Sequence, residues 1–142
     1  MSDLSDLRRR VRQALQDAKQ KAAARRAARD EASRAWDAAL EQTVTPLMRD
    51  IAAALSGEGL AFRLDTPAGA ARLMSERSPD DYIEVRLDDS DERDAPGVVG
   101  RTVRARGRQS VTVIEEPLGP PSEITTDRLM AFLMTAIQPL AR

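Results

Sequence analysis

Residues 4–42 contain neither glycine nor proline, and alanine, arginine, glutamine, aspartate and glutamate dominate them. Most of these residues favour the α-helix, alanine most strongly. An uninterrupted helix of this length would extend roughly 60 Å, because each residue adds about 1.5 Å. A chain of 142 residues supplies one domain and an appendage. We therefore expect an N-terminal helical arm, with Ser2 or Ser5 as its cap, that is longer than the body it is attached to.

One face of the predicted arm carries an apolar stripe with the spacing of three and four that is typical of a helix. Its residues are Leu4, Leu7, Val11, Leu15, Ala18 and Ala22 and, after an alanine-rich stretch, Trp36 and Leu40. An isolated helix of this kind is only partly stable in water, since most helical stability comes from packing. We expect these residues to form the seam of a coiled-coil homodimer; docking on another protein and a solvated arm are the alternatives. The orientation of two paired arms stays open, because no buried polar residue fixes it.

The sequence Thr-Val-Thr-Pro at residues 43–46 is predicted to break the helix. It divides the chain into the arm, residues 1–44, and a compact body, residues 45–142. Proline is favoured at the first position of a helix, so a short second helix is expected over residues 47–56, with Thr45 as its cap.

The middle of the chain alternates between apolar and polar residues with a period of two, which is typical of β-strands. The expected strands are residues 60–65, 71–74, 82–88, 98–106 and 109–115. In the third strand, Ile83, Val85 and Leu87 are expected to face inward, and Glu84 and Arg86 outward.

Prolines and glycines mark the connections. Residues 66–69 are predicted to form a tight turn with Pro67 at its second position. Gly97 and Gly100 interrupt a strand pattern, where glycine often marks a bulge. Pro117, Pro120 and Pro121 are interpreted as a stiff linker before a last helix that starts near Thr125 or Thr126. The fold class is therefore α+β: a long helical arm, then a body of helix, antiparallel meander of four to five strands, and helix.

The chain contains no histidine and no cysteine. It lacks the ordinary proton shuttle near pH 7, imidazole and thiolate metal ligands, and the thiolate nucleophile. The acidic loop lacks the spacing of a calcium loop and is interpreted as solvated; its residues are Asp88, Asp89, Asp91, Glu92 and Asp94. We expect no enzymatic activity, no cofactor and no metal site.

Charge is unevenly distributed along a chain whose formal net charge is −1. Residues 1–30 carry nine basic and four acidic side chains, and the rest of the chain is acidic. The candidates for contact with a polyanion are Arg8, Arg9, Arg10 and Arg12 in the arm and Arg104, Arg106 and Arg108 at a predicted hairpin. The pI of about 5.6 lies far below that of dedicated nucleic-acid-binding domains. No aromatic residue lies among the arginines to stack on bases, so nucleic acid is the weaker interpretation.

The start of the chain has no apolar stretch like that of a secretory signal, and no run approaches the ~20 apolar residues of a membrane helix. We expect a cytoplasmic protein without membrane contact. The leading hypothesis is a non-catalytic interaction, adaptor or chaperone-like protein that dimerises through its arm and presents its sheet to a protein partner.

The small acidic body, with strands between helices, resembles bacterial secretion chaperones of the helix–sheet–helix kind in architecture. The alternative function is a nucleoid-type DNA-binding protein that uses the basic arm and the arginine-rich hairpin. A third hypothesis makes the chain a subunit of a larger assembly, with its arm threaded into a neighbour.

Overall fold

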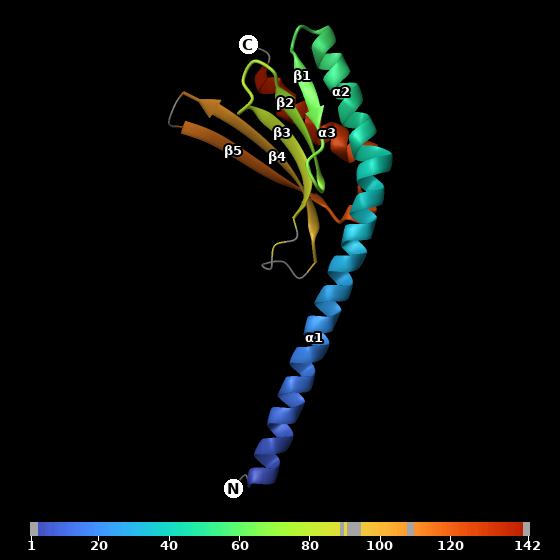
Figure 1. Cartoon of the computed structure of the whole chain (residues 1–142), viewed down its shortest axis with the longest axis vertical. Helices are drawn as coiled ribbons and strands as arrows, with labels where there is room; N and C mark the ends of the chain where they lie inside the picture. Colours follow the sequence, from blue (N-terminus) through green and yellow to red (C-terminus); the bar gives the residue numbers. More distant parts are fainter. Residues whose placement is uncertain (1–2, 89, 91–94, 108–109, 141–142) are drawn as a thin grey trace.

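The computed structural model of the chain describes residues 3–88, 90, 95–107 and 110–140. It confirms the α+β class: a long N-terminal helix precedes a five-stranded antiparallel sheet and a C-terminal helix (Figure 1). The helical elements are α1 (Leu4–Ala39), the π-helical turn η1 (Leu40–Val44), α2 (Thr45–Gly57), the 3₁₀ turn η2 (Pro121–Glu123), α3 (Thr126–Ile137) and the 3₁₀ turn η3 (Gln138–Leu140). The strands are β1 (Phe62–Asp65), β2 (Ala70–Ser75), β3 (Tyr82–Asp88), β4 (Gly97–Arg106) and β5 (Ser110–Gly119).

Helices α1 and α2 form one continuous helical rod, so the predicted break at residues 43–46 is wrong. Pro46 has no N–H, and in a regular α-helix its ring would clash with the carbonyl group four residues earlier. The π-helical turn avoids this clash because it is wider than an α-helical turn; the N–H of Thr45 donates to the carbonyl oxygen of Leu40, five residues back. Val44, and not Thr45, occupies the cap position of α2.

The first turn of α1 is capped by Asp3, whose Oδ1 accepts a hydrogen bond of 2.8 Å from the N–H of Asp6. Ser5 lies inside the helix and is not the cap; Ser2 lies outside the described residues. A carboxylate at this position also complements the positive end of the helix dipole. At the other end of the chain, α3 starts at Thr126, as predicted, and the side chain of Thr125 caps it by accepting a hydrogen bond from the N–H of Arg128.

The sheet is a meander in which each strand pairs with the next, in the order β1-β2-β3-β4-β5. Helices α2 and α3 cover one face of it (Figure 1). Fully buried apolar side chains fill the space between the two layers, because this face of each strand is apolar in alternation. The largest of them are Trp36, Met48, Leu73, Leu129, Leu133, Val44, Val85 and Val98.

Two prolines take positions different from those expected. The N–H of Ala70 donates to the carbonyl oxygen of Pro67 at 3.0 Å, so Pro67 is the first residue of the turn and not the second. Gly69, the third residue, has φ +75°, which a type II turn requires at this position. Pro117 lies within β5, paired with Val99, and not in a linker. An edge strand tolerates proline because its outward N–H needs no partner in the sheet.

The predicted bulge lies not at Gly97 or Gly100 but between Val98 and Val99. Gly100 is instead the point where β4 and α3 approach each other closely. A Cβ built on Gly100 would lie 2.6 Å from ring atoms of Phe132, which is buried. Only glycine leaves room for that ring, so Gly100 sets how closely the helix packs on the sheet.

The substitution Gly100→Ala is expected to lower the free energy of unfolding by about 1–3 kcal/mol, because the buried ring must move. Gly57→Ala is the matched control: a Cβ there has nothing within 4 Å, and the helix favours alanine by up to about 1 kcal/mol. Urea unfolding of both variants measures the difference. Equal stabilities of the two variants would show that Phe132 adapts without cost.

Candidate interaction surfaces

The N-terminal part of the arm stands free of the body (Figure 1). Every residue from 3 to 27 is exposed except Asp6, which is half-buried. Four large aliphatic side chains of the predicted stripe, Leu4, Leu7, Val11 and Leu15, are between 50% and 62% exposed. Ala18 and Ala22 continue this line and are exposed as well. We call these six residues the arm stripe.

The last two residues of the predicted seam do not belong to the arm stripe. Trp36 is only 2% exposed and lies in the core of the body, and Leu40 packs against that core. The indole Nε1 of Trp36 donates a hydrogen bond of 2.8 Å to the carbonyl oxygen of Gly69 in the β1–β2 turn. Their assignment to an interface between arms is therefore wrong. The same face of the helix is exposed in the arm stripe and becomes buried against the body at Trp36 and Leu40.

The arm stripe points to the side of α1 on which the body lies. Trp36 follows Ala18 by 18 residues and Leu7 by 29, which are about five and eight turns of 3.6 residues. The three side chains therefore lie nearly in line along the helix. Any element that packs on the arm stripe must therefore lie on the same side of α1 as the body, between the body and the N-terminal end of the arm.

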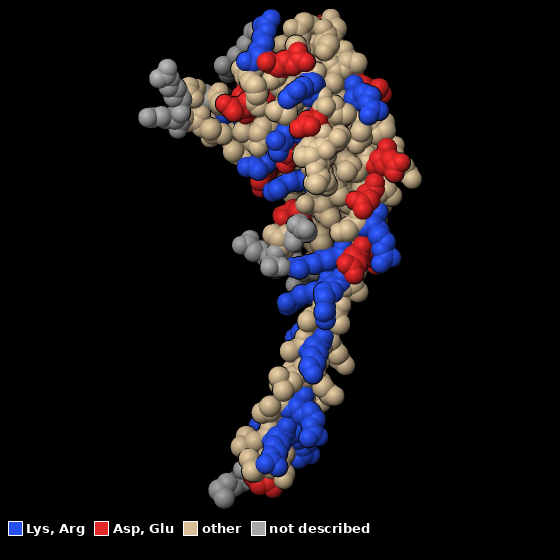
Figure 2. All heavy atoms as spheres, in the orientation of Figure 1, with Lys and Arg blue, Asp and Glu red and all other residues tan. Residues whose placement is uncertain are grey.

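Basic side chains border the arm stripe on both sides. Arg8, Arg12 and Lys19 line a shallow groove along it together with the apolar residues, and Arg10 and Lys21 follow the other border in the helical spacing. Arg9 forms an ion pair with Asp6. Figure 2 shows basic side chains along the arm, whereas basic and acidic side chains alternate over the body.

The structure does not bring the two predicted basic groups together. Arg8, Arg9, Arg10 and Arg12 lie near the free end of the arm, and the β4–β5 hairpin projects from the far part of the body (Figure 1). Arg104 is half-buried in a groove between this hairpin and α3. The side chain of Arg106, and Arg108 as a whole, lie outside the described residues. The two groups therefore lie on different parts of the molecule.

Strand β5 forms one edge of the sheet and is poorly covered on both faces. Val111, Val113 and Ile114 are between 44% and 62% exposed. On the helical side, a groove of about 490 Å³ separates the strand from α3, lined among others by Ile114, Phe132, Ala136 and Pro139. We call residues 111–115 the β5 edge. Apolar alternation identifies the strand in the sequence, but it does not show that the strand lies at the edge.

The face of the sheet opposite the helices carries a row of charges, one from each strand. Adjacent strands pair Asp65 with Arg72, Arg72 with Glu84, Glu84 with Arg101, and Arg101 with Glu115. The signs alternate across all five strands, and opposite charges in neighbouring positions stabilise a sheet. We call these five residues the charge row. The expectation that Glu84 and Arg86 face away from the core is confirmed.

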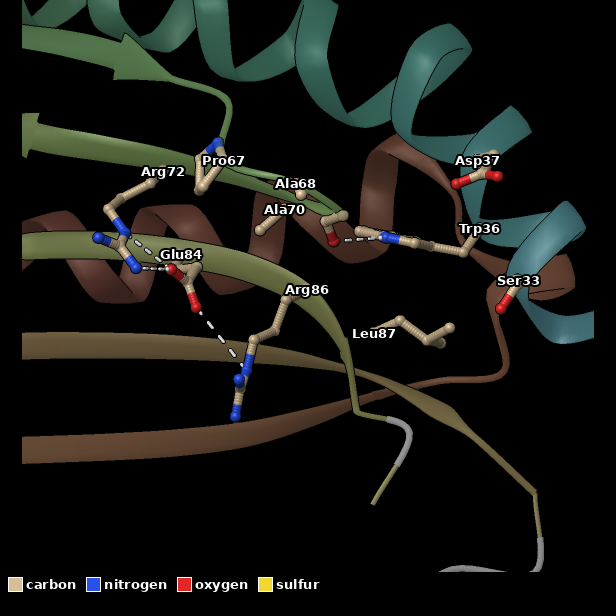
Figure 3. Close-up of a pocket in the computed structure, with 11 residues that line it drawn as sticks. Ser33, Trp36, Asp37, Pro67, Ala68, Ala70, Arg72, Glu84, Arg86 and Leu87 are labelled. Carbon is tan, nitrogen blue, oxygen red and sulfur yellow. Dashed lines mark hydrogen bonds and ion pairs between the residues drawn. The ribbon is translucent and has the colours of Figure 1, made fainter. Parts of the chain in front are cut away.

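Glu84 differs from the other members of the charge row because it is only 3% exposed. One of its oxygens, Oε2, accepts hydrogen bonds from Nε of Arg72 at 2.7 Å and from its terminal Nη2. The other, Oε1, lies 3.7 Å from Nε of Arg86 (Figure 3). The guanidinium group of Arg72 also stacks over the ring of Tyr82 at 4.3 Å. Glu84 is thus an anchored structural carboxylate.

Arg72, Glu84 and Arg86 line the sheet side of a pocket of about 400 Å³, and Trp36 and Asp37 of α1 line its other side (Figure 3). The two arginines and two carboxylates around it balance in charge, and the carboxylate of Glu84 is already occupied. Within the part of the chain that the structure describes, no group of three or more acidic side chains lies close enough to hold a metal ion. Most of the acidic loop, at residues 89 and 91–94, lies outside that part.

No protein family model, curated protein or solved structure matches the chain. Among the described helices, none combines the length and the apolarity that crossing a bilayer requires.

We expect Glu84→Gln to lower the free energy of unfolding by about 1–3 kcal/mol, because two arginines lose their buried counterion. The expected cost lies below the ~3–5 kcal/mol that is usual for breaking a fully buried pair, since the side chains of Arg72 and Arg86 are partly exposed. Glu115→Gln is the control within the same charge row: its carboxylate is 53% exposed, so its loss should cost no more than about 0.5 kcal/mol. Chemical unfolding of both variants tests this, and an equal effect would refute the structural role of Glu84.

Proposed function

We propose that the protein is a non-catalytic interaction protein that self-associates through its arm stripe and presents its sheet to a protein partner. The observation that supports this most directly is the exposure of Leu4, Leu7, Val11 and Leu15 along one line of a free helix. A helix without tertiary packing is only marginally stable in water. Packing the stripe against a second helix removes this exposed apolar area from water and stabilises the arm.

The position of the body favours an antiparallel pair of arms. In a parallel pair, the stripe of each arm would face the other helix along its whole length. Both bodies lie on that same side of their rods, so they would occupy the same space. In an antiparallel pair, each arm ends beneath the body of the other copy. The free part of the arm is then buried without a collision.

The basic borders of the stripe determine how this pairing responds to salt. Two paired arms bring Arg8, Arg12 and Lys19 of each copy close to basic residues of the other. Like charges repel, and salt screens this repulsion between exposed groups. Self-association of the arms should therefore become stronger as the ionic strength rises.

DNA binding is the second candidate function, and the cluster of arginines at residues 8–12 is the observation that favours it. Contacts between arginines and phosphates weaken steeply with salt, because they release condensed counterions. Salt should therefore strengthen self-association of the arms but weaken DNA binding, and this difference separates the two functions. Duplex DNA that is retained at low salt and released at higher salt would favour DNA binding.

Val11→Asp should raise the dissociation constant of self-association at least tenfold, because each copy places a charge in an apolar seam. Tenfold corresponds to about 1.4 kcal/mol. Gln20→Asp introduces the same charge on the opposite face of the helix and should leave the constant within about twofold. Sedimentation equilibrium of the full chain at low and high salt measures both effects. If the two variants behave alike, the arm stripe is not the interface.

The orientation of the arms can be measured directly, since the chain has no cysteine and a single introduced one carries a unique spin label. For Ser5→Cys, an antiparallel pair with Leu4 beside Ala22 places the labelled residues about 24 Å or more apart along the axis. A parallel pair leaves only the separation of about 8–10 Å between helix axes, plus the label arms. Ala14→Cys, near the middle of the stripe, should give a short distance in either case. A short distance at both positions would contradict the antiparallel arrangement.

A further inference from the structure

The two edges of the sheet are protected to different degrees. Strand β1 has only four residues, with the charged Arg63 and Asp65 exposed among them. Strand β5 has ten residues, and its stretch Val-Thr-Val-Ile at 111–114 is uncharged and exposed. Soluble proteins usually shorten, charge or cover such an edge, because its unpaired backbone groups recruit another strand. The β5 edge has none of these protections before Glu115.

Pro117 indicates which backbone groups of β5 face outward. It lacks an N–H and pairs with Val99 in register, and a proline in a sheet is tolerated where the N–H would point away from the neighbouring strand. Residues alternate in a strand with period two, so Glu115, Val113 and Val111 share this outward orientation. These three residues offer three donors and three acceptors to a strand laid alongside.

We propose that the β5 edge pairs with the β5 edge of a second copy, antiparallel and with Val113 opposite Val113 of the second copy. In this register Thr112 lies opposite Ile114 of the second copy. Cross-strand pairs of β-branched residues such as these stabilise a sheet. The two sheets join into one, in which Val113 contacts Val113 of the second copy and Ile114 contacts its Thr112. This contact is independent of the arm.

The distribution of charge along the hairpin favours a second copy in this direction. Two acidic residues, Glu115 and Glu116, lie in the second half of the strand, and they form ion pairs with Arg101 and Arg128 of the same chain. Near the start of β5, the neighbouring strand β4 presents Arg104 beside Thr112. Antiparallel pairing sets Glu115 of each strand opposite Val111 of the other copy, and it directs the acidic part of each hairpin toward the part of the other hairpin that carries Arg104. Parallel pairing would set Glu115 beside Glu115 of the second copy, and like charges in such positions are destabilising.

A chain with two separate self-complementary contacts does not stop at a dimer. Each contact obeys its own two-fold axis and is saturated by one partner. The arm of each copy binds one neighbour, and its β5 edge binds another. At sufficient concentration the full-length protein should therefore form assemblies larger than a dimer, in which arm contacts and edge contacts alternate.

The test combines the two contacts in four versions of the full chain: wild type, Val11→Asp, Val113→Glu and the double variant. Two glutamates would meet directly at the proposed axis, so Val113→Glu should weaken the edge contact at least tenfold. Thr66→Glu, an exposed position beside the opposite edge of the sheet, adds the same charge as a control. Light scattering across concentration is expected to give large assemblies for wild type, dimers for each single variant and monomers for the double variant.

A charge-exchange experiment tests the register itself. With Val11→Asp present throughout, Val113→Glu and Val113→Lys should each be monomeric. Mixed together they should dimerise, since Glu and Lys then meet at the axis. Circular dichroism of the separate variants confirms that each is folded.

The outcomes for the two contacts are separate. Dimers that survive Val113→Glu in the Val11→Asp background, or a Val11→Asp protein that is already monomeric, would overturn the edge contact. Wild-type assemblies unchanged by Val11→Asp would overturn the arm contact alone. A mixture of Glu and Lys variants that stays monomeric would refute the pairing of Val113 with Val113.

Discussion

The burial of Trp36 determines how the rest of the molecule is arranged. Its indole ring supplies a large apolar surface to the core, and its N–H is satisfied by the carbonyl oxygen of Gly69. An aromatic side chain with one polar atom can in this way tie a helix both to a core and to a turn. Because α1, η1 and α2 are one continuous rod, this attachment also fixes the direction in which the free part of the arm leaves the body.

The sheet keeps its two faces stable by different means. The face toward α2 and α3 is apolar and close-packed. The other face is stabilised by the charge row, in which each internal member lies between two residues of opposite sign. This arrangement lets the structure bury Glu84 without a layer of chain above it, because Arg72 and Arg86 themselves cover the carboxylate. The helices cover the first four strands better than the fifth, which leaves β5 as the least protected part of the body.

Most local features of the structure could be predicted from the sequence, whereas features that depend on distant residues could not. The predicted helix break and the predicted position of the turn after β1 are the local exceptions. Helix formers without glycine or proline indicate the arm, and period-two alternation indicates the strands, since both signals lie within a few residues. The spacing of Trp36 matches the arm stripe, but spacing alone does not distinguish burial within a chain from burial between chains. The burial of Glu84 depends on Arg72 and Arg86, and its place in the charge row becomes visible only when the strand register is known. Pro117 resembles a linker proline until β5 is known to be an edge.

The π-helical turn also acts as a phase correction within the rod. Trp36, Leu40, Val44 and Met48 follow one another at intervals of four residues, and in a regular α-helix each such step rotates the side chain by about 40°. Three steps would turn Met48 about 120° away from Trp36, so that only one of these two side chains could face the core. A π-helical turn accommodates one additional residue, equivalent to about 100° of α-helical rotation, so all four side chains reach the same core. Deleting a single residue from η1 would therefore leave both helices intact but rotate the arm stripe to another side of the molecule.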